Sequence, residues 1–308
     1  MESNRSNSSN ASLVFRLFDE NPNSELGILD SPQRPLQAPP PCFEVLPSEV
    51  PTSVKYVTEP LNVGGVILLK GRVSTHEVFA LGNSDLVPGK YEGGLKLWEG
   101  SLDLITALSC EIKVGKLSFA GQRVLELGCG HGLPGIFACQ KGAASVHFQD
   151  FNAEVLQSLT IPNVNANVQK MPEHLATDTN KNNNLETRFF AGDWGEVHSI
   201  LPYACKDETE ASEMAQLNRG SSYDVILMAE TVYSISALPN LCRLIKKCLC
   251  TPQGVVYMAA KKYYFGVGGG SRRFLSLVEN DGTFSASLVS EVADGSSNVR
   301  EVWKLLPK

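Results

Sequence analysis

Short apolar runs alternate with amphipathic segments along most of the chain after residue 97. The stretch LWEGSLDLITALSC places Leu97, Leu104 and Leu108 at helical spacing, which predicts an amphipathic helix. Strands are predicted at residues 123–128, 145–150, 187–193, 222–230 and 254–261. Helices are predicted at residues 133–142, 152–160, 238–250 and 271–281.

The order of these elements predicts an α/β fold. Strand, helix and strand recur at the spacing of βαβ units, so we expect a mostly parallel sheet with helices on both faces, a three-layer Rossmann-like arrangement. The last two predicted strands, residues 284–292 and 299–306, are separated only by a short turn at 293–298. They must therefore form an antiparallel pair at the C-terminal end.

Composition divides the chain into three parts. Residues 1–50 are rich in Ser, Asn and Pro and are expected to form a flexible tail. Residues 51–96 are predicted to be an N-terminal extension, with a small hairpin made by VKYV and GGVILLKGRV. Residues 97–308 form the main domain, in which two polar insertions, 172–186 and 205–222, are predicted to be surface loops.

Charge and cysteine usage narrow the class of protein. Lys plus Arg number 27 and Asp plus Glu 33, a net charge of -6, which argues against a dedicated nucleic-acid surface. No apolar stretch is long enough to span a bilayer and the N-terminus lacks a secretory signal, so we expect a cytoplasmic and nuclear protein without membrane contact. The eight cysteines lack the spacing of a metal site and are expected to be reduced thiols.

A glycine-rich loop follows the first predicted parallel strand. The stretch VLELGCGHGLPG contains four glycines, at 128, 130, 132 and 135. Glycine permits positive backbone dihedrals and close approach of a ligand, and ligands bind at this edge of an open parallel sheet. The last three glycines also match the dinucleotide pattern GxGxxG, and Asp150, about twenty residues on, suits any ligand with a ribose.

Glu126 separates the two candidate ligands. Its carboxylate lies two residues before the first glycine, where it would repel a pyrophosphate and attract a cationic amino acid. S-adenosylmethionine has a cationic amino-acid end for the loop and a ribose for Asp150. With the final antiparallel strand pair, the sequence resembles the class I, seven-β-strand S-adenosylmethionine-dependent methyltransferases over roughly residues 90–308.

Several segments outside the common fold carry a finer resemblance. YEGGLKLWEGSLDL, FQDFN with LTIPNVNAN, FFAGDW, AETVY and KKYYFGVGGG together resemble the histidine protein methyltransferase family. The resemblance implies a protein-histidine N-methyltransferase with S-adenosylmethionine as cofactor and S-adenosylhomocysteine as product. It implies a protein partner, ribosomal protein three of the large subunit, for an enzyme that we expect to be a monomer without direct nucleic-acid binding.

The resemblance also implies site residues. The cofactor contacts are Trp98, Glu99, Ser101, Glu126, Gly128, Gly130, Asp150, Phe151, Asn152, Gly192, Asp193, Trp194 and Ala229. Asp193 would accept a hydrogen bond from the adenine amino group, and Trp194 would stack on the ring. Gly100 departs from the family, in which a larger residue is common at this place.

The predicted catalytic residues are Glu230 and Tyr233 of AETVY. Glu230 would accept a hydrogen bond from the ring N–H of the substrate histidine, or receive the proton lost after methylation. Tyr263, Tyr264 and Phe265 would flank the imidazole. A lysine methyltransferase and a non-catalytic ribosome-assembly factor remain alternatives, because both would keep the cofactor residues; a nicotinamide enzyme is a more distant one.

Overall fold

A computed structural model describes residues 40–49, 54–82, 85–168, 185–204, 222–293, 295 and 298–308 of the chain. The tail predicted for residues 1–50 therefore lies mostly outside the described residues. So do nearly all of the two polar insertions.

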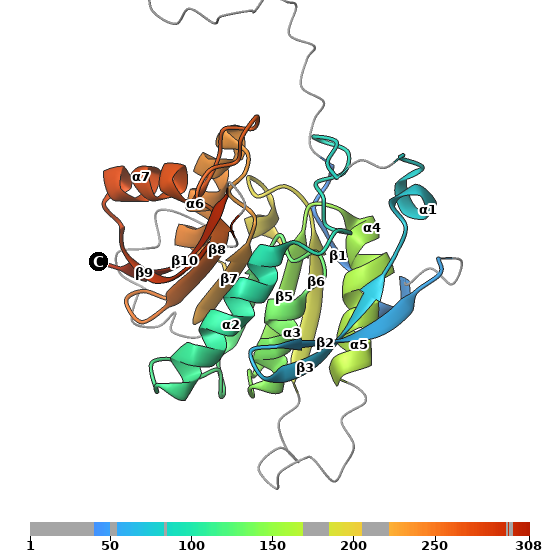
Figure 1. Ribbon diagram of the computed structural model, residues 1–308, viewed down its shortest axis with the longest axis horizontal. Helices are drawn as coiled ribbons and strands as arrows, with labels where there is room; N and C mark the ends of the chain where they lie inside the picture. The colour runs from blue at the N-terminus through green and yellow to red at the C-terminus, as the bar shows by residue number, and fades with distance from the viewer. Residues whose placement is uncertain are drawn as a thin grey trace, which may run out of the picture. The chain divides into compact units, whose positions relative to one another are not determined.

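The central sheet has eight strands in the order β1-β6-β5-β4-β7-β8-β10-β9 (Figure 1). Seven of them are β4 (Arg123–Leu127), β5 (Ser145–Asp150), β6 (Glu186–Ala191), β7 (Val225–Ala229), β8 (Val255–Lys261), β9 (Phe284–Ala293) and β10 (Val299–Pro307). Strands β6, β5, β4, β7 and β8 run parallel to one another, and β10 runs antiparallel to both β8 and β9. The predicted α/β sheet with its C-terminal antiparallel pair is confirmed.

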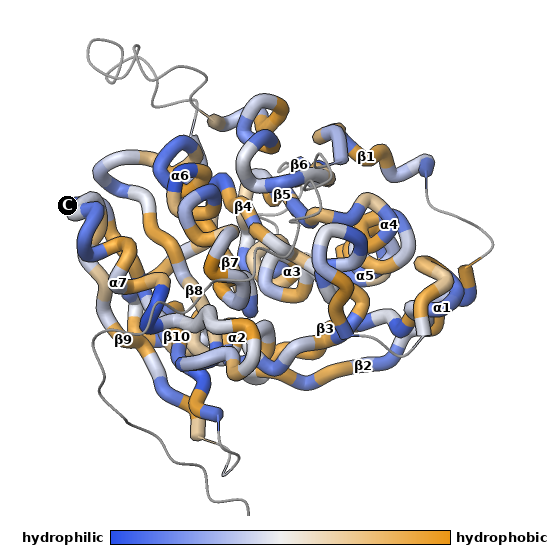
Figure 2. The backbone as a smooth tube through the Cα atoms, turned by 90° about the horizontal axis from the view of Figure 1, so that it is seen from above, coloured by the Kyte–Doolittle hydropathy of each residue, from blue (hydrophilic) through white to orange (hydrophobic). Residues whose placement is uncertain are grey.

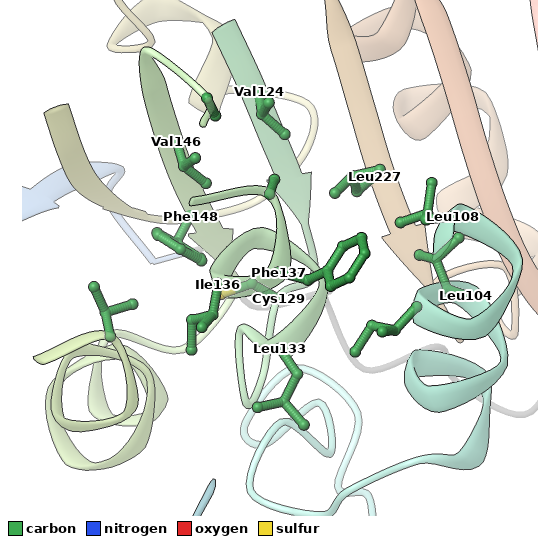
Figure 3. Packing of buried hydrophobic residues seen from close by; sticks show 14 of the residues in the cluster. Leu104, Leu108, Val124, Cys129, Leu133, Ile136, Phe137, Val146, Phe148 and Leu227 are labelled. Atoms are coloured by element: carbon green, nitrogen blue, oxygen red, sulfur yellow. The ribbon is translucent and has the colours of Figure 1, made fainter. Parts of the chain in front are cut away.

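Helices cover both faces of this sheet. Helices α2 (Glu99–Lys113), α3 (Leu133–Gln140) and α5 (Ile161–Val168) lie on one side, and α6 (Leu238–Cys248) lies on the other (Figure 2). Helix α7 (Ser271–Asp281) contacts α6, and buried side chains of the two helices, such as Phe274 and Leu241, belong to one hydrophobic cluster. In Figure 3, Phe137 of α3 points toward Leu104 and Leu108 of α2, and all three are fully buried. The apolar strands thus have both faces covered, as a parallel sheet requires.

The helix predicted at residues 152–160 continues eight residues further. It begins as α4 (Ala153–Val155), passes through a π-helical segment (Leu156–Thr160) and continues as α5. Pro162 has no N–H to donate to the helical ladder, and the wider π turn lies directly before it. The helix therefore continues through Pro162 instead of ending there.

Strand β1 (Phe43–Val45) lies within the segment expected to be a flexible tail. It pairs antiparallel with β6, Val45 opposite Phe189, and adds an eighth strand to the expected seven. Val45 is 1% exposed. A short 3-10 helix, η1 (Pro47–Glu49), follows. A strand of three residues is too short to show a period of two, so composition alone was a wrong guide here.

The N-terminal hairpin exists, but its first strand is displaced from the prediction. Strands β2 (Val57–Val63) and β3 (Val66–Arg72) pair antiparallel around a turn at residues 64–65, whereas VKYV ends where β2 begins. Pro60 lies within β2, an edge strand where a missing N–H is tolerated. The Ser109 hydroxyl of α2 donates to the Gly64 carbonyl (2.9 Å), which fixes the hairpin on the main domain.

The remaining short elements are α1 (Thr75–Phe79), η4 (Val197–Ser199) and η6 (Ile235–Ala237). In the ranges that the structure describes, no helix is long and apolar enough to cross a membrane. The same ranges contain no cluster of His, Cys, Asp and Glu side chains suited to a metal ion.

Candidate active site

The predicted site residues gather at the C-terminal ends of the parallel strands, and the glycine loop after β4 lies at their centre. Gly128 and Gly130 have φ of +59° and +48°, a left-handed region that favours glycine. A Cβ at Gly128 would lie 2.8 Å from Thr231 Cγ2, and one at Gly130 would lie 2.9 Å from the Gly94 carbonyl oxygen. The loop is therefore held between two other protein segments.

Glu126 lies beneath this loop. It is 2% exposed, and its Oε2 accepts a hydrogen bond from the Gly135 backbone N–H (2.8 Å) at the start of α3. Burial raises the pKa of the Glu126 carboxyl well above its usual range. Glu126 therefore joins the end of β4 to Gly135, the last glycine of the segment, and so positions the loop between them.

Asp150 ends β5 beside the loop. Its Oδ2 accepts a hydrogen bond from the Gly130 N–H (2.9 Å), and its Oδ1 accepts one from the Asn152 N–H (3.0 Å). Burial raises the pKa of Asp150 to about 6, although these two bonds act in the opposite direction. Phe151, the next residue, is half-buried. Asp150 thus lies where a ribose is expected in a doubly wound fold.

The Asn152 side chain contacts the segment before α2. Its Oδ1 accepts a hydrogen bond from the Glu92 N–H (3.0 Å), and its Nδ2 donates to the Lys90 carbonyl (2.9 Å). It therefore anchors the segment before α2 to the end of β5.

The turn after β6 brings Gly192, Asp193 and Trp194 to the same edge. The Asp193 carboxylate accepts a hydrogen bond from the Gly195 N–H (2.7 Å), which closes the turn. The Trp194 indole N–H donates to Gln149 Oε1 (2.8 Å), and the Gly192 carbonyl accepts from Gln149 Nε2 (2.9 Å).

Gln149 was missed by the sequence analysis. It is fully buried in β5, and its Oε1 also accepts a hydrogen bond from the Gly128 N–H (3.3 Å). One side chain therefore joins the glycine loop to the turn after β6. The available signal was an amide within a predicted internal strand, because a buried amide needs hydrogen-bond partners.

The first turn of α2 forms another wall. Trp98 precedes the helix, and its indole N–H donates to the Gly93 carbonyl (3.0 Å). The Lys261 ammonium lies 5.5 Å from the Trp98 ring centroid and 5.8 Å from that of Tyr264. Glu99 is exposed and Ser101 is half-buried. A cation between two aromatic rings thus borders this side of the site.

Glu230 follows Ala229 at the end of β7 and has φ of +58°. Its N–H donates to the Ala259 carbonyl (2.8 Å), and its Oε2 accepts a hydrogen bond from the Tyr264 hydroxyl. Burial raises the pKa of the Glu230 carboxyl, and the Tyr264 hydrogen bond and the Lys261 charge oppose that rise. A Cβ at Gly100 would lie 2.6 Å from Glu230 Oε1, so Gly100 makes room for this carboxylate.

The predicted aromatic residues separate into two groups. Tyr233 and Tyr264 point inward, their ring centroids 6.4 Å apart at an interplanar angle of 67°. The Tyr233 hydroxyl donates to the Glu92 carboxylate rather than to Glu230. Burial raises the pKa of both tyrosine hydroxyls. Tyr263 and Phe265 are 52% and 71% exposed, so they are available to a partner from outside.

Comparison with known proteins identifies the family. A family model described as lysine methyltransferase matches residues 89–193. The histidine protein methyltransferase 1 homolog of Dictyostelium discoideum is 39% identical over 228 residues, 74% of this chain and 62% of that relative. The Rattus norvegicus homolog is 37% identical over 228 residues, 69% of this chain and 57% of that relative. The chain belongs to the histidine protein methyltransferase family.

The matched part spans about three fifths of these curated relatives. Among solved structures, a T. thermophilus 16S rRNA methyltransferase in complex with AdoMet and guanosine is 15% identical, with a TM-score of 0.48 over 84% of this chain and 52% of that chain.

S-adenosylmethionine is the cofactor of this methyltransferase fold, and two observations fit it to the site. The glycine loop and Asp150 lie together at the carboxyl edge of the sheet. Thr231 Oγ1 and Glu230 Oε1 are buried and have no hydrogen-bond partner among the described residues. Buried polar atoms without partners at the carboxyl edge of a parallel sheet are suited to a bound ligand. Thr231 was also missed, although the motif AETVY contains it.

Proposed function

We propose that this chain transfers a methyl group to a ring nitrogen of a histidine in a protein. The single observation that carries the proposal is Glu230: a buried carboxylate with one fixed oxygen and one unpartnered oxygen, at the end of β7 beside the glycine loop. Family membership supports the same reaction. S-adenosylmethionine supplies the methyl group from its sulfonium when it is bound.

The loop and its supports would hold the cofactor. Gly128 and Gly130 offer close backbone approach, Asp150 offers a carboxylate to the ribose hydroxyls, and Trp194 offers a ring face to the adenine. Gln149 and Glu126 fix these groups relative to one another through the hydrogen bonds described above. Alignment is the main requirement of an in-line displacement, so rigid supports matter more here than strong acids or bases.

Glu230 would set the tautomer of the substrate imidazole. A neutral histidine has one nitrogen with a lone pair and one N–H, so an acceptor for the N–H leaves the other nitrogen free to attack. Glu230 Oε1 is the acceptor that we propose, and it would then take the proton lost from the methylated ring. Tyr233 contributes its ring to the wall, because its hydroxyl is bound to Glu92.

The substrate that we propose is ribosomal protein three of the large subunit, as the family resemblance implies. The net charge of -6 favours encounter with a basic protein. Exposed Tyr263 and Phe265 provide aromatic area at the mouth of the site for residues near the target histidine. We further propose that the enzyme acts as a monomer, in the cytoplasm and nucleus.

Lysine methylation is the second candidate, because the matching family model is described as lysine methyltransferase. A lysine nucleophile must lose a proton before attack, whereas a neutral histidine need not.

Retention of Glu126, Asp150, Asp193 and Glu230 in one site favours an active enzyme over a non-catalytic binder.

The test uses the purified chain, isotopically labelled S-adenosylmethionine and large-subunit proteins from cells that lack this enzyme. Labelled protein is hydrolysed and its amino acids are separated. We expect label in methylhistidine. Label in methyllysine would replace the proposal with the second candidate, and tight cofactor binding without label would support the non-catalytic alternative.

A further inference from the structure

We infer that Tyr264 is a positioning residue for Glu230: its hydroxyl holds one carboxylate oxygen, so that the other is the acceptor presented to the reacting histidine. This inference rests on the proposed function. It assigns Tyr264 a role other than the stacking contact expected from the sequence.

The backbone and Gly100 fix where the Glu230 carboxyl group lies. Among the described residues, only Ala80 and Glu230 are non-glycine residues with positive φ, and such a conformation is retained where its surroundings determine it. The Glu230 N–H is bound to the Ala259 carbonyl, and the side chain lies against Gly100. Gly100 lies on the Oε1 side of the carboxyl group and offers that oxygen no hydrogen bond. The Tyr264 hydroxyl donates to the other oxygen, Oε2, so only Oε1 is left without a hydrogen-bond partner.

The direction of the tyrosine proton follows from a second contact. The Lys261 backbone N–H donates to the Tyr264 hydroxyl oxygen at 3.5 Å, so that oxygen acts there as an acceptor. A phenol has one proton to donate, and the Glu230 carboxylate receives it. Hydrogen bonds to a charged acceptor are stronger than neutral ones, so this contact is suited to holding a carboxylate in one orientation.

Tyr264 is itself held by the loop between β8 and α7. Its N–H donates to the Gly269 carbonyl (3.0 Å), and its carbonyl accepts from the Gly268 N–H (2.8 Å). The Gly269 N–H donates to the Tyr233 carbonyl (3.0 Å), which ties the loop to the segment that carries Glu230. A Cβ at Gly269 would lie 2.2 Å from that carbonyl oxygen, so the glycines of KKYYFGVGGG allow close contact.

A double-mutant cycle tests the inference. Tyr264→Phe, Glu230→Gln and the double variant are compared with the wild type by single-turnover methyl transfer, and the Kd for S-adenosylmethionine is measured for each. We expect Tyr264→Phe to slow transfer about tenfold or more, with Kd within about twofold. In the Glu230→Gln background, the same change should have no further effect, because Tyr264 acts through Glu230.

Tyr257→Phe is the matched control. Tyr257 is fully buried, and its hydroxyl donates to the Glu111 carboxylate (3.2 Å), outside the site. Its transfer rate should stay within about twofold of the wild type. An equal loss in Tyr257→Phe would overturn the inference, as would an unchanged rate in Tyr264→Phe or equal losses in both Glu230 backgrounds.

Failure of the inference can be told from failure of the proposed function. If the wild type labels lysine, the proposed function fails, and the cycle on that activity still reports the coupling of Tyr264 to Glu230. If the wild type labels histidine and the two variants are additive, only the inference fails.

Discussion

Gly100 shows how one residue acquires its meaning from another far along the chain. In the sequence analysis, the family resemblance led us to expect a larger residue at this position. In the structure a Cβ at this position would lie 2.6 Å from Glu230 Oε1 and 2.9 Å from its Cγ. The sequence could predict Glu230 from its place after a strand. It could not predict the contact with Gly100, which exists only once α2 packs beside the end of β7.

Asp150 gives a prediction of pH dependence. Burial raises its pKa to about 6, so the carboxyl gains a proton as the pH falls from 7 to 5. Protonation removes the charged acceptor that we propose for the ribose. The Kd for S-adenosylmethionine, measured by calorimetry, should therefore be about tenfold higher at pH 5 than at pH 7.

Asp150→Asn is the control for this titration. Its neutral amide should bind the cofactor more weakly than the wild type at pH 7, with a Kd that changes little down to pH 5. Circular dichroism at each pH shows that both proteins remain folded. A wild-type Kd that stays constant over this range would rule out an ionised Asp150 as a cofactor contact.

At the scale of elements, hydrophobic periodicity predicted the strands and helices that lie inside the fold. Strand β7, for example, consists of the apolar residues VILMA, four of them buried, and such an apolar run is a strong signal. The errors among the strands fall at the edges of the sheets. β1 has only three residues, and β2 is mostly exposed and contains Pro60. Edge strands bury few side chains, so their sequences carry little periodicity.

Strand β1 should nevertheless contribute to stability. Val45 is 1% exposed and pairs opposite Phe189, so Val45→Ala should lower the free energy of unfolding by about 1–3 kcal/mol. Leu46→Ala, at a side chain that is 50% exposed, should change it by less than about 0.5 kcal/mol. Urea unfolding measures both. Equal effects of the two substitutions would show that β1 is not packed on β6 in solution.

At the scale of the whole molecule, the topology brings distant motifs to one edge of the sheet. Parallel strands place the ends of β4, β5, β6, β7 and β8 together, so the sequence could predict that these motifs meet. It could not predict which side chains pair. The Tyr233 hydroxyl was expected near the methyl group and is bound to Glu92, while Tyr264 was expected to stack and is bound to Glu230. Such pairings depend on side-chain directions within loops, which periodicity does not contain.

The central claim is that the carboxylate after β7 orients the substrate histidine and receives its proton, while the glycine loop holds the cofactor. The most direct measurement compares the wild type with Glu230→Gln for methylhistidine formation and, separately, for the Kd for S-adenosylmethionine. We predict a rate of methyl transfer about 100-fold lower, with Kd within about twofold. A Glu230→Gln enzyme that forms methylhistidine at the wild-type rate, with cofactor binding intact, would contradict the claim.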